Sequence, residues 1–202
     1  MKPADPRSTP TDPSVKSLDD KELVRAIMDR DADAIAELFD RFSGLLSALS
    51  MRILNDPADV EEILQETFLQ VWNQAARYDA KRSSVSTWLV LIARSRSIDR
   101  LRSRQVKLRT ATAARQENPD THTSPKGVGT VLMKERRRRL QEEMAKLPEE
   151  QRQVLELAFY GGMTQSEIAE QTSIPLGTVK TRTLLAMKKL RQALRAEIGE
   201  LL

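Results

Sequence analysis

Cysteine is absent from this chain of 202 residues, and histidine occurs once, as His122. Without cysteine the chain can form neither a disulfide nor a thiolate metal site. A lone histidine lacks the partners that a histidine-based zinc site or a Ser-His relay requires. No window reaches the ~18 apolar residues of a membrane span, and the first residues are polar and proline-rich, without an apolar signal core. We therefore expect a cytoplasmic protein with no membrane insertion, no metal site and no cofactor.

Glycine and aromatic residues are also scarce, with seven glycines and 4% aromatic residues. Leu, Ala, Arg, Glu and Gln are abundant and favour helices, and no alternating apolar run is flanked by hairpin turns. Hydrophobic residues at 40% and charged residues at 31% suit a folded protein. The sequence predicts an all-α protein with essentially no sheet.

Proline content and apolar periodicity divide the chain into four parts. Residues 1–16 are expected to be a disordered tail, with prolines at positions 3, 6, 10 and 13. Residues 17–108 carry apolar side chains at three- and four-residue steps, which predicts four helices whose buried residues include Phe39 and Leu91. Residues 109–132 are expected to be a flexible linker, and residues 133–202 a second helical unit. The predicted fold is two small helical domains joined by this linker.

Residues 164–183 have the pattern of a helix-turn-helix. Thr164 is expected to cap the first helix, with Glu167 as the reciprocal partner of a capping box. Val179 is expected to fill the angle between the two helices. Ser173 stands in the turn where glycine is common, and a left-handed backbone would cost a non-glycine residue on the order of 1 kcal/mol there. This cost is tolerable, so the motif remains the preferred interpretation.

The second helix of this motif has a basic and polar outer face. A helix start of this kind fits the DNA major groove, where Arg and Lys contact guanine edges or phosphates. The alternative is an ordinary three-helix bundle that does not bind DNA. The residues expected to face DNA are Pro175, Leu176, Gly177, Thr178, Lys180, Thr181 and Arg182.

The net charge of +4 conceals strong segregation of the charged residues. Residues 55–70 hold five acids and no base, residues 94–109 hold seven bases and one acid, and residues 174–195 hold six bases and no acid. Basic patches indicate a polyanionic partner, and the separate acidic patch indicates a partner of another kind. The alternative is that these segments are solvated helix faces.

Within the acidic segment, three carboxylates recur at helical spacing beside Gln65 and Phe68. An exposed acidic and polar ridge on a stiff helix suits docking to a basic protein. Paired carboxylates could also serve acid–base chemistry or bind a metal, but neither a glycine-rich loop nor a histidine accompanies them. The sequence therefore predicts a docking surface in a protein that is not an enzyme, formed by Asp59, Glu62, Gln65, Glu66 and Phe68.

Three segments resemble the sigma-70 family of RNA polymerase sigma factors. The segment from Asp59 to Trp72 resembles the core-polymerase-binding motif of region 2, and the segment from Thr87 to Arg102 resembles the helix that binds the promoter −10 element. Residues 147–191 resemble region 4, which binds the −35 element. The order of the segments and the short linker resemble the extracytoplasmic-function (ECF) group.

The resemblance implies a transcription initiation factor that directs core RNA polymerase to promoters and promotes strand opening. The acidic ridge would dock on the coiled coil of the largest polymerase subunit, and region 4 would contact the flap of the second largest subunit. The helix-turn-helix residues would bind the −35 element. A dedicated anti-sigma factor is a further expected partner.

For the −10 element, the resemblance implies that residues 78–86 and the helix after them hold melted DNA. They would pocket an extruded base, whose extrusion costs a few kcal/mol of stacking. Basic residues of the helix would grip the strand backbone. The loop lacks the family's usual glycine, and Ser95 stands where asparagine is common. The implied residues are Lys81, Arg82, Ser83, Ser84, Trp88, Arg94, Ser95, Asp99 and Arg102.

Two other functions fit parts of the sequence. A conventional activator or repressor would use only the helix-turn-helix, as a dimer on palindromic DNA and without binding polymerase. A nucleic-acid enzyme would show metal-dependent cleavage. Capture by core polymerase would distinguish a sigma factor from a conventional activator or repressor. Absence of cleavage across divalent ions would exclude a nucleic-acid enzyme.

Overall fold

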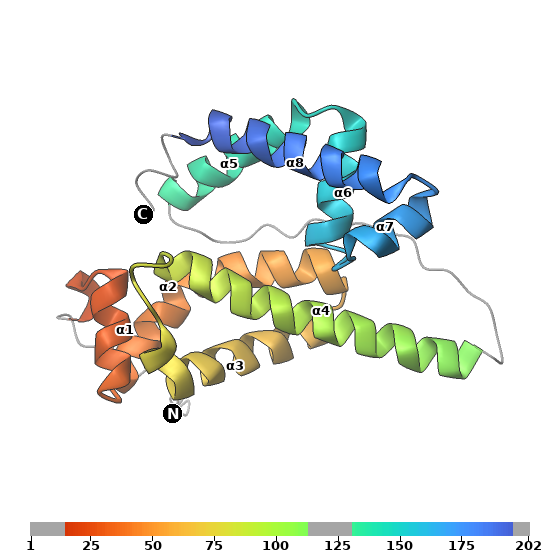
Figure 1. Cartoon of the computed structure of the whole chain (residues 1–202). Helices are drawn as coiled ribbons and strands as arrows, with labels where there is room; N and C mark the ends of the chain where they lie inside the picture. Colours follow the sequence, from red (N-terminus) through yellow and green to blue (C-terminus); the bar gives the residue numbers. More distant parts are fainter. Residues whose placement is uncertain (1–14, 113–130, 196–202) are drawn as a thin grey trace, which may run out of the picture.

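The computed structural model describes residues 15–112 and 131–195, and over these ranges it contains helices and no strand (Figure 1). The N-terminal domain comprises η1 (Val15–Ser17), α1 (Asp20–Met28), α2 (Ala32–Leu54), α3 (Pro57–Gln74), η2 (Ala75–Arg77) and α4 (Val85–Thr112). The C-terminal domain comprises α5 (Val131–Ala145), α6 (Glu149–Phe159), α7 (Gln165–Thr172) and α8 (Leu176–Ala193). The prediction of an all-α protein with two helical domains is confirmed.

Short polar residues fix where the N-terminal helices begin. Asp19 accepts a hydrogen bond of 2.8 Å from the Glu22 amide, while the Glu22 carboxylate accepts one of 2.7 Å from the Asp19 amide. This capping box satisfies two amides that a helix start leaves without partners. Pro57 begins α3, where no amide partner is needed, and Asp56 accepts from the Ala58 amide at 2.9 Å. These local signals set the register of the helices that carry the candidate sites.

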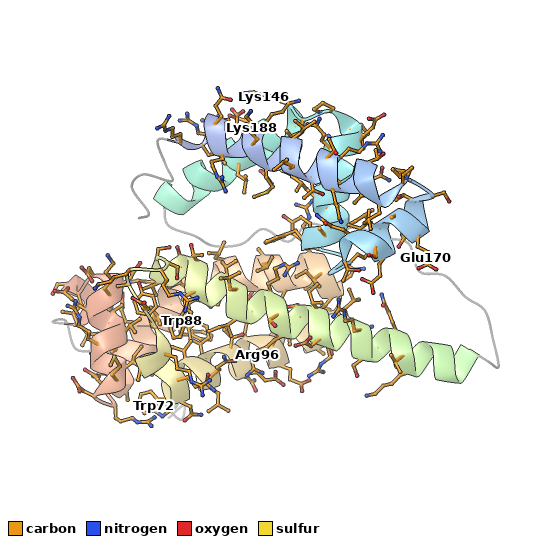
Figure 2. The ribbon with its side chains drawn as sticks, in the orientation of Figure 1. Trp72, Trp88, Arg96, Lys146, Glu170 and Lys188 are labelled. Carbon is orange, nitrogen blue, oxygen red and sulfur yellow. The ribbon has the colours of Figure 1, made fainter. Side chains whose placement is uncertain are left out.

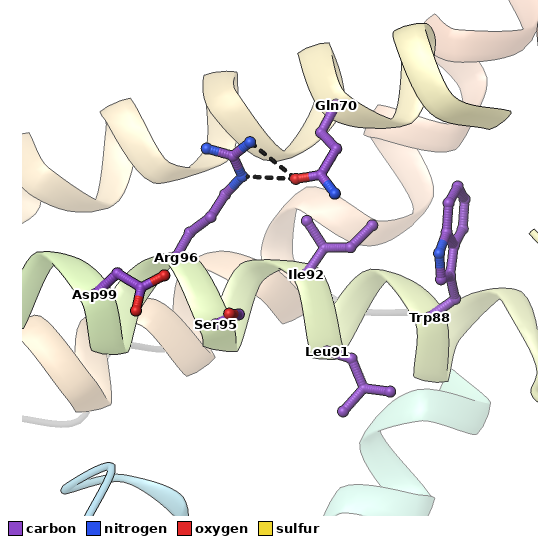
Figure 3. Close-up of a pocket in the computed structure, with 7 residues that line it drawn as sticks. All are labelled: Gln70, Trp88, Leu91, Ile92, Ser95, Arg96 and Asp99. Atoms are coloured by element: carbon purple, nitrogen blue, oxygen red, sulfur yellow. Dashed lines mark hydrogen bonds between the residues drawn. The ribbon is translucent and has the colours of Figure 1, made fainter. Parts of the chain in front are cut away.

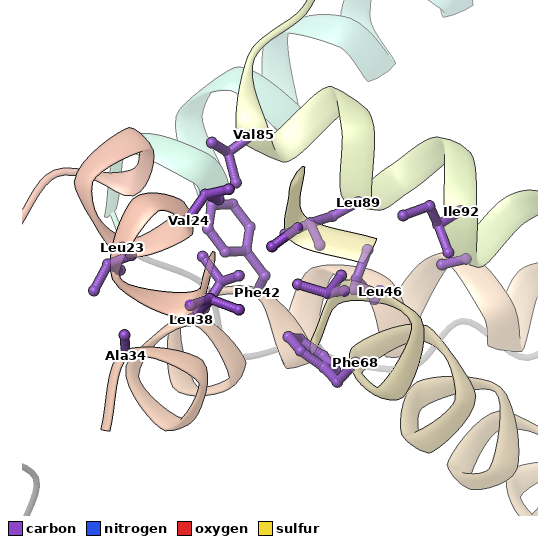
Figure 4. Close-up of a cluster of buried hydrophobic side chains, with 14 of the residues drawn as sticks. Leu23, Val24, Ala34, Leu38, Phe42, Leu46, Phe68, Val85, Leu89 and Ile92 are labelled. Carbon is purple, nitrogen blue, oxygen red and sulfur yellow. The ribbon is translucent and has the colours of Figure 1, made fainter. Parts of the chain in front are cut away.

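The core of the N-terminal domain lies between α1, α2, α3 and α4, with α2 in contact with the other three helices. Phe42, Leu46 and Leu89 are fully buried in this cluster, which Figure 4 shows together with Phe68 and Ile92. Burial of side chains of this size contributes about 1.5–3 kcal/mol each and is the main source of stability. The packing of α4 against α2 and α3 therefore determines which α4 residues face outward.

Two residues expected in the core lie at the surface instead. Leu91 is 55% exposed and Phe39 is 41% exposed, so the prediction that they are buried is wrong. On α4 the core face is taken by Leu89 and Ile92, and Leu91 is about 200° from Leu89 at 100° per residue. Phe39 lies at the core's edge, with its ring centre 4.8 Å from that of Phe68.

The helices extend beyond the expected domain limits at three places. Val15, inside the expected tail of residues 1–16, is buried in the N-terminal core. α4 continues to Thr112 and α5 starts at Val131, so both helices enter the range expected for the linker. Residues 1–14, the rest of the expected linker at 113–130, which includes His122, and residues 196–202 lie outside the described residues. In the part of the chain that is described, no helix is long and apolar enough to span a membrane.

Leu89→Ala and Leu91→Ala form a matched pair that tests the rotation of α4. Leu89→Ala removes a fully buried side chain, and we expect the free energy of unfolding to fall by about 2–5 kcal/mol. Leu91→Ala is expected to change it by less than about 0.5 kcal/mol, because this side chain is solvated. Urea unfolding followed by circular dichroism measures both values. Equal losses would contradict the rotation described here.

Candidate nucleic-acid interface

The helix-turn-helix forms from α7, the turn at Ser173 and α8. Thr164 Oγ1 accepts a hydrogen bond of 3.2 Å from the Glu167 amide, and the Glu167 carboxylate accepts one of 2.6 Å from the Thr164 amide. The hydrogen bond from the Thr164 backbone also lowers the pKa of the Glu167 carboxyl. Ser173 has φ 56° and ψ 28°, and Val179 is fully buried against Ile168. The capping box, the left-handed turn and the buried Val179 predicted from the sequence are confirmed.

The start of α8 presents the expected polar and basic residues outward. Lys180, Thr181, Leu176 and their neighbours Pro175 and Gly177 are exposed, whereas Thr178 and Arg182 are half-buried. A Cβ at Gly177 would meet no atom within 4 Å, so the backbone is open to a close approach from outside. All seven residues expected to face DNA thus lie at the N-terminal end of α8 or directly before it; they are Pro175, Leu176, Gly177, Thr178, Lys180, Thr181 and Arg182.

Arg182 already has an anionic partner within the C-terminal domain. Its Nη2 lies 3.1 Å from a carboxylate oxygen of Glu150, at the start of α6. The Glu150 side chain is 68% exposed and the Arg182 side chain 23% exposed, so solvent screens the pair. A phosphate or a guanine edge would therefore compete with a weakly held carboxylate for this guanidinium. Figure 2 shows Lys188 on the same helix, further from the turn.

The loop before α4 is fixed to the N-terminus of that helix. The Tyr78 hydroxyl donates a 3.0 Å hydrogen bond to the carbonyl of Ser83, and its ring centre lies 5.2 Å from that of Trp88. Ser84 Oγ accepts a hydrogen bond of 3.2 Å from the Thr87 amide, as a helix cap does. Lys81 and Arg82 are exposed at the loop's tip. The loop thus carries two exposed cations and is anchored to the start of α4 through Tyr78 and Ser84.

A hollow of about 450 Å³ opens between α3 and α4 (Figure 3). Of the nine residues implied for −10 DNA, Trp88, Ser95 and Asp99 line it and the other six do not. The other four lining residues were not among those implied by the sequence; they are Gln70, Leu91, Ile92 and Arg96. The steps from 88 to 92, 95 and 99 follow one face of a helix, which is a signal that could have found Ile92. Arg96 donates two hydrogen bonds to Gln70 Oε1, at 2.8 and 3.0 Å, and so forms one wall.

The basic run of α4 divides between two faces of the helix. Arg96, Arg100 and Arg104 point to α3, where they pair with its carboxylates. Arg100 lies 3.0 Å from Asp59 and 2.6 Å from Glu62, Arg104 lies 2.7 Å from Asp59, and Arg96 pairs with Glu66. We call these contacts the α3–α4 ladder. Arg94 and Arg102 point instead to the C-terminal domain.

The ladder changes the electrostatics of the acidic ridge on α3. Two contacts of 2.6 and 2.7 Å join the Arg100 guanidinium to both oxygens of Glu62, and this hydrogen bonding lowers the pKa of the Glu62 carboxyl. The same carboxylate raises the pKa of Arg100. Glu62 is therefore ionised at neutral pH, and arginines of the same domain partly compensate the negative charge of the ridge.

The five candidates for polymerase docking lie at different depths. Glu62 and Gln65 are exposed, and Glu66 is half-buried. The Asp59 side chain is 17% exposed, and Phe68 is buried in the core at 7%. Leu69 was not among the expected docking residues, yet its side chain is 60% exposed. It lies four residues after Gln65, and this spacing places both side chains on the same face of α3. Among the described residues, no group of His, Asp or Glu is placed to share a metal ion.

Two family models match the chain. The sigma-70 region 2 model matches residues 38–106, and the sigma-70 region 4 model matches residues 137–190. The ECF RNA polymerase sigma factor RpoE of Cereibacter sphaeroides is 38% identical over 176 residues, which cover 84% of this chain and 92% of that protein. The chain belongs to the ECF group of sigma-70 family sigma factors. An ECF sigma factor binds core RNA polymerase and initiates transcription at specific promoters.

Other ECF sigma factors are similar over most of their length. SigK of a Mycobacterium species is 34% identical over 175 residues, covering 85% of this chain and 89% of SigK. A crystal structure of Rhodobacter sphaeroides SigE in complex with the anti-sigma ChrR has 34% identity and a TM-score of 0.45, covering 88% of this chain and 98% of that one. In the 202-residue chain, the region 2 match spans α3 and most of α2 and α4. The region 4 match spans α6, α7 and most of α5 and α8.

Replacing Arg100 tests the ladder at a single carboxyl group. Because the Glu62 pKa is lowered by Arg100, this ion pair adds stability above the ordinary glutamate pKa of about 4.3. The added stability is lost as the pH falls through the lowered pKa of the folded state. In Arg100→Gln we expect the Glu62 pKa to rise toward its ordinary value, measured by NMR titration of the side-chain carbonyl. Arg102→Gln, on the same helix but facing away from α3, is the control and should leave it unchanged.

Proposed function

We propose that this ECF sigma factor binds the −35 element through the start of α8 and the −10 element through α4 and the loop before it. The observation that carries the proposal is the exposed start of α8, where Gly177 leaves the backbone open to a close approach. This helix start belongs to a helix-turn-helix whose first helix begins with a capping box. Arginine and lysine there can contact guanine edges or phosphates in the major groove. The domain limits that we propose are residues 17–108 for region 2, residues 109–132 for the linker and residues 133–202 for region 4.

The −10 function is supported by the hollow between α3 and α4. Its volume of about 450 Å³ suits a flipped base, and Trp88 offers an aromatic face on which a base can stack. Lys81 and Arg82 at the loop tip, with Ser83 and Ser84 behind them, would hold the backbone of the melted strand. Ser95 and Asp99 would contact the base itself. Strand opening then draws its free energy from these contacts, without ATP, metal or cofactor, and the protein acts as a cytoplasmic regulator that is not an enzyme.

The α3 ridge is the proposed docking surface for the coiled coil of the largest polymerase subunit. Glu62, Gln65 and Glu66 offer negative and polar groups at the surface, and the exposed Leu69 extends the same helix face. Asp59 would act mainly through the ladder, and Phe68 would hold α3 against the core rather than touch the partner. Region 4 would contact the flap of the second largest subunit. Such an arrangement uses charge for orientation and an apolar side chain for close packing.

An anti-sigma factor is a further proposed partner. SigE of Rhodobacter sphaeroides, which is 34% identical to this chain, forms a complex with the anti-sigma ChrR. On α8, beyond the DNA-facing start, Leu184, Leu185 and Met187 are exposed, at 70%, 42% and 46%. Apolar side chains grouped in this way are a suitable contact for a protein partner.

Run-off transcription with purified core polymerase tests the proposed function. The full chain is added to core enzyme on a library of fragments from the source genome, and transcripts are mapped. We expect discrete start sites that share spaced −35 and −10 sequences, formed without ATP hydrolysis before initiation. If active core enzyme yields no specific transcript from any fragment, the proposal is wrong.

Charge reversal on α3 tests polymerase docking. Glu62→Lys places a cation on the exposed ridge, and we expect capture by core polymerase to weaken about tenfold or more, or ~1.4 kcal/mol. Glu61→Lys is the control, because it makes the same change of charge about 100° around the helix. Circular dichroism checks that all variants fold. Equal capture by the ridge variant and the control would contradict the docking surface.

Arg182→Ala tests whether α8 recognises the −35 element. If Arg182 contacts a base, we expect promoter duplex binding to weaken by ~1–3 kcal/mol, with little effect on unrelated duplexes. Glu150→Gln releases the same guanidinium from its ion pair and should strengthen binding slightly, by up to about 1 kcal/mol. Lys189→Ala, seven residues further along α8, is the control for loss of charge. Fluorescence anisotropy measures all three, and an equal loss on every duplex would contradict base contact by Arg182.

A further inference from the structure

The wall of the hollow between α3 and α4 carries a side-chain amide whose orientation is fixed. Arg96 Nε and Nη2 donate hydrogen bonds of 3.0 and 2.8 Å to the same oxygen of Gln70. An amide oxygen has two lone pairs, and both are thus occupied. A flipped amide would turn its NH2 group toward these donors and lose both hydrogen bonds. Gln70 therefore keeps its oxygen toward Arg96, and its nitrogen points away from that arginine in Figure 3.

The next amide along α3 supports the same orientation. Arg77 Nη1 donates a 3.1 Å hydrogen bond to Gln74 Oε1, which makes this oxygen the acceptor of the pair. Gln70 Nε2 lies 3.4 Å from the same oxygen, so one of its N–H groups is directed along the helix to Gln74. Its second N–H has no acceptor within residues 15–112 and 131–195, the ranges that the structure describes. Two arginines thus set the polarity of both amides and leave one donor at the wall.

The other polar groups of the hollow have different hydrogen-bonding capacities. The Asp99 carboxylate accepts, and the Ser95 hydroxyl can donate or accept. Trp88 supplies an aromatic surface in the same hollow. The hollow therefore combines a fixed donor at Gln70 with an acceptor at Asp99, on two different helices.

The four bases present donors and acceptors in two opposite orders. Adenine and cytosine carry an amino group where guanine and thymine carry a carbonyl. The ring nitrogen beside this group accepts a hydrogen bond in adenine and cytosine and donates one in guanine and thymine. A donor that cannot turn into an acceptor binds only one of the two neighbouring groups. A wall with a fixed donor therefore distinguishes amino-bearing from carbonyl-bearing bases.

We propose that Gln70 is a specificity-determining residue for the extruded base, and that Arg96 is the positioning residue that fixes its donor. The inference rests on the proposed −10 function and deepens it, because it assigns the choice between the two classes of base to one amide. Gln70 comes from α3, so the base would be held between two helices rather than on α4 alone.

Gln70→Glu and Gln74→Glu form a matched pair that tests the inference. Each replaces an amide by a carboxylate of the same shape and adds one negative charge beside an arginine, but only Gln70 lines the hollow. The full chain is bound to core polymerase on a promoter found by run-off transcription, and each −10 position is varied to all four bases. Competition binding gives the relative affinities, in which a general repulsion by the added charge cancels.

We expect Gln70→Glu to change the ratio between amino-bearing and carbonyl-bearing bases about fivefold or more at one −10 position, because a carboxylate accepts where the amide donated. Gln74→Glu should keep the wild-type preference at every position. Gln70→Met, which has neither a donor nor a strong acceptor, should flatten the preference at the same position. On a template that lacks the base there, Gln70→Glu and Gln74→Glu should bind equally.

Arg96→Ala tests the positioning role. Without the two donors the Gln70 amide can turn either group to the hollow, so we expect the preference at that position to fall about threefold or more. Arg96→Lys, which can still donate to the amide oxygen, should restore part of it. A merely structural role of Arg96 would lower the affinity for all four bases alike, and that result would remove Arg96 from the inference.

The results that overturn the inference are distinct from those that overturn the −10 function. If the wild-type holoenzyme prefers no base at any −10 position, the −10 function is wrong and the inference falls with it. If the wild type discriminates and both Gln70 variants share its profile, Gln70 does not select the base, while the −10 function stands. Circular dichroism checks folding, and Gln70→Met decides alone if Gln70→Glu does not fold.

Discussion

Arginines spaced four residues apart on α4 lie against the carboxylates of α3, and this ladder fits the rotation of α4 that the packing of Leu89 and Ile92 selects. Each pair is partly solvated and therefore adds little to stability, so burial of Leu89 and Ile92 supplies most of it. The ladder acts mainly on orientation. Without Arg96, Arg100 and Arg104, the acids of α3 would repel one another along one helix face. With them, α4 has one rotation that both buries Leu89 and Ile92 and pairs its arginines with the carboxylates of α3.

The functional surfaces of region 2 follow from this rotation. Once Arg96 and Arg100 face α3, the residues from Trp88 to Asp99 at alternating steps of four and three line the hollow. Arg94 and Arg102 then lie on another face, toward the C-terminal domain. One helix thus contacts α3, which carries the proposed polymerase-docking surface, lines the hollow proposed to hold a base, and contacts the C-terminal domain. Its arginines lie on two sides, and each of those sides has different anionic or polar partners.

Local signals and long-range contacts differ in how far the sequence reveals them. The capping box at Thr164, the left-handed Ser173 and the buried Val179 were predictable, because each depends on neighbours a few residues away. Pro57 and the all-helical fold were predictable for the same reason. The exposure of Leu91 was not, because α4 has apolar residues on more than one side and only packing against α2 and α3 selects among them. The ladder was also hidden, since a charge run shows no partner that lies some forty residues earlier in the chain.

The contacts of Arg94 show that a guanidinium of α4 can be satisfied by backbone carbonyls as well as by carboxylates. Arg94 donates hydrogen bonds to the carbonyls of Ala158 and Phe159, where the dipole of α6 ends with roughly half an elementary negative charge. Arg96 and Arg100 meet the carboxylates of α3 instead, which are the stronger hydrogen-bond acceptors. The two arginine faces of α4 are therefore held by acceptors of different strength, and the contacts with the end of α6 are the weaker set.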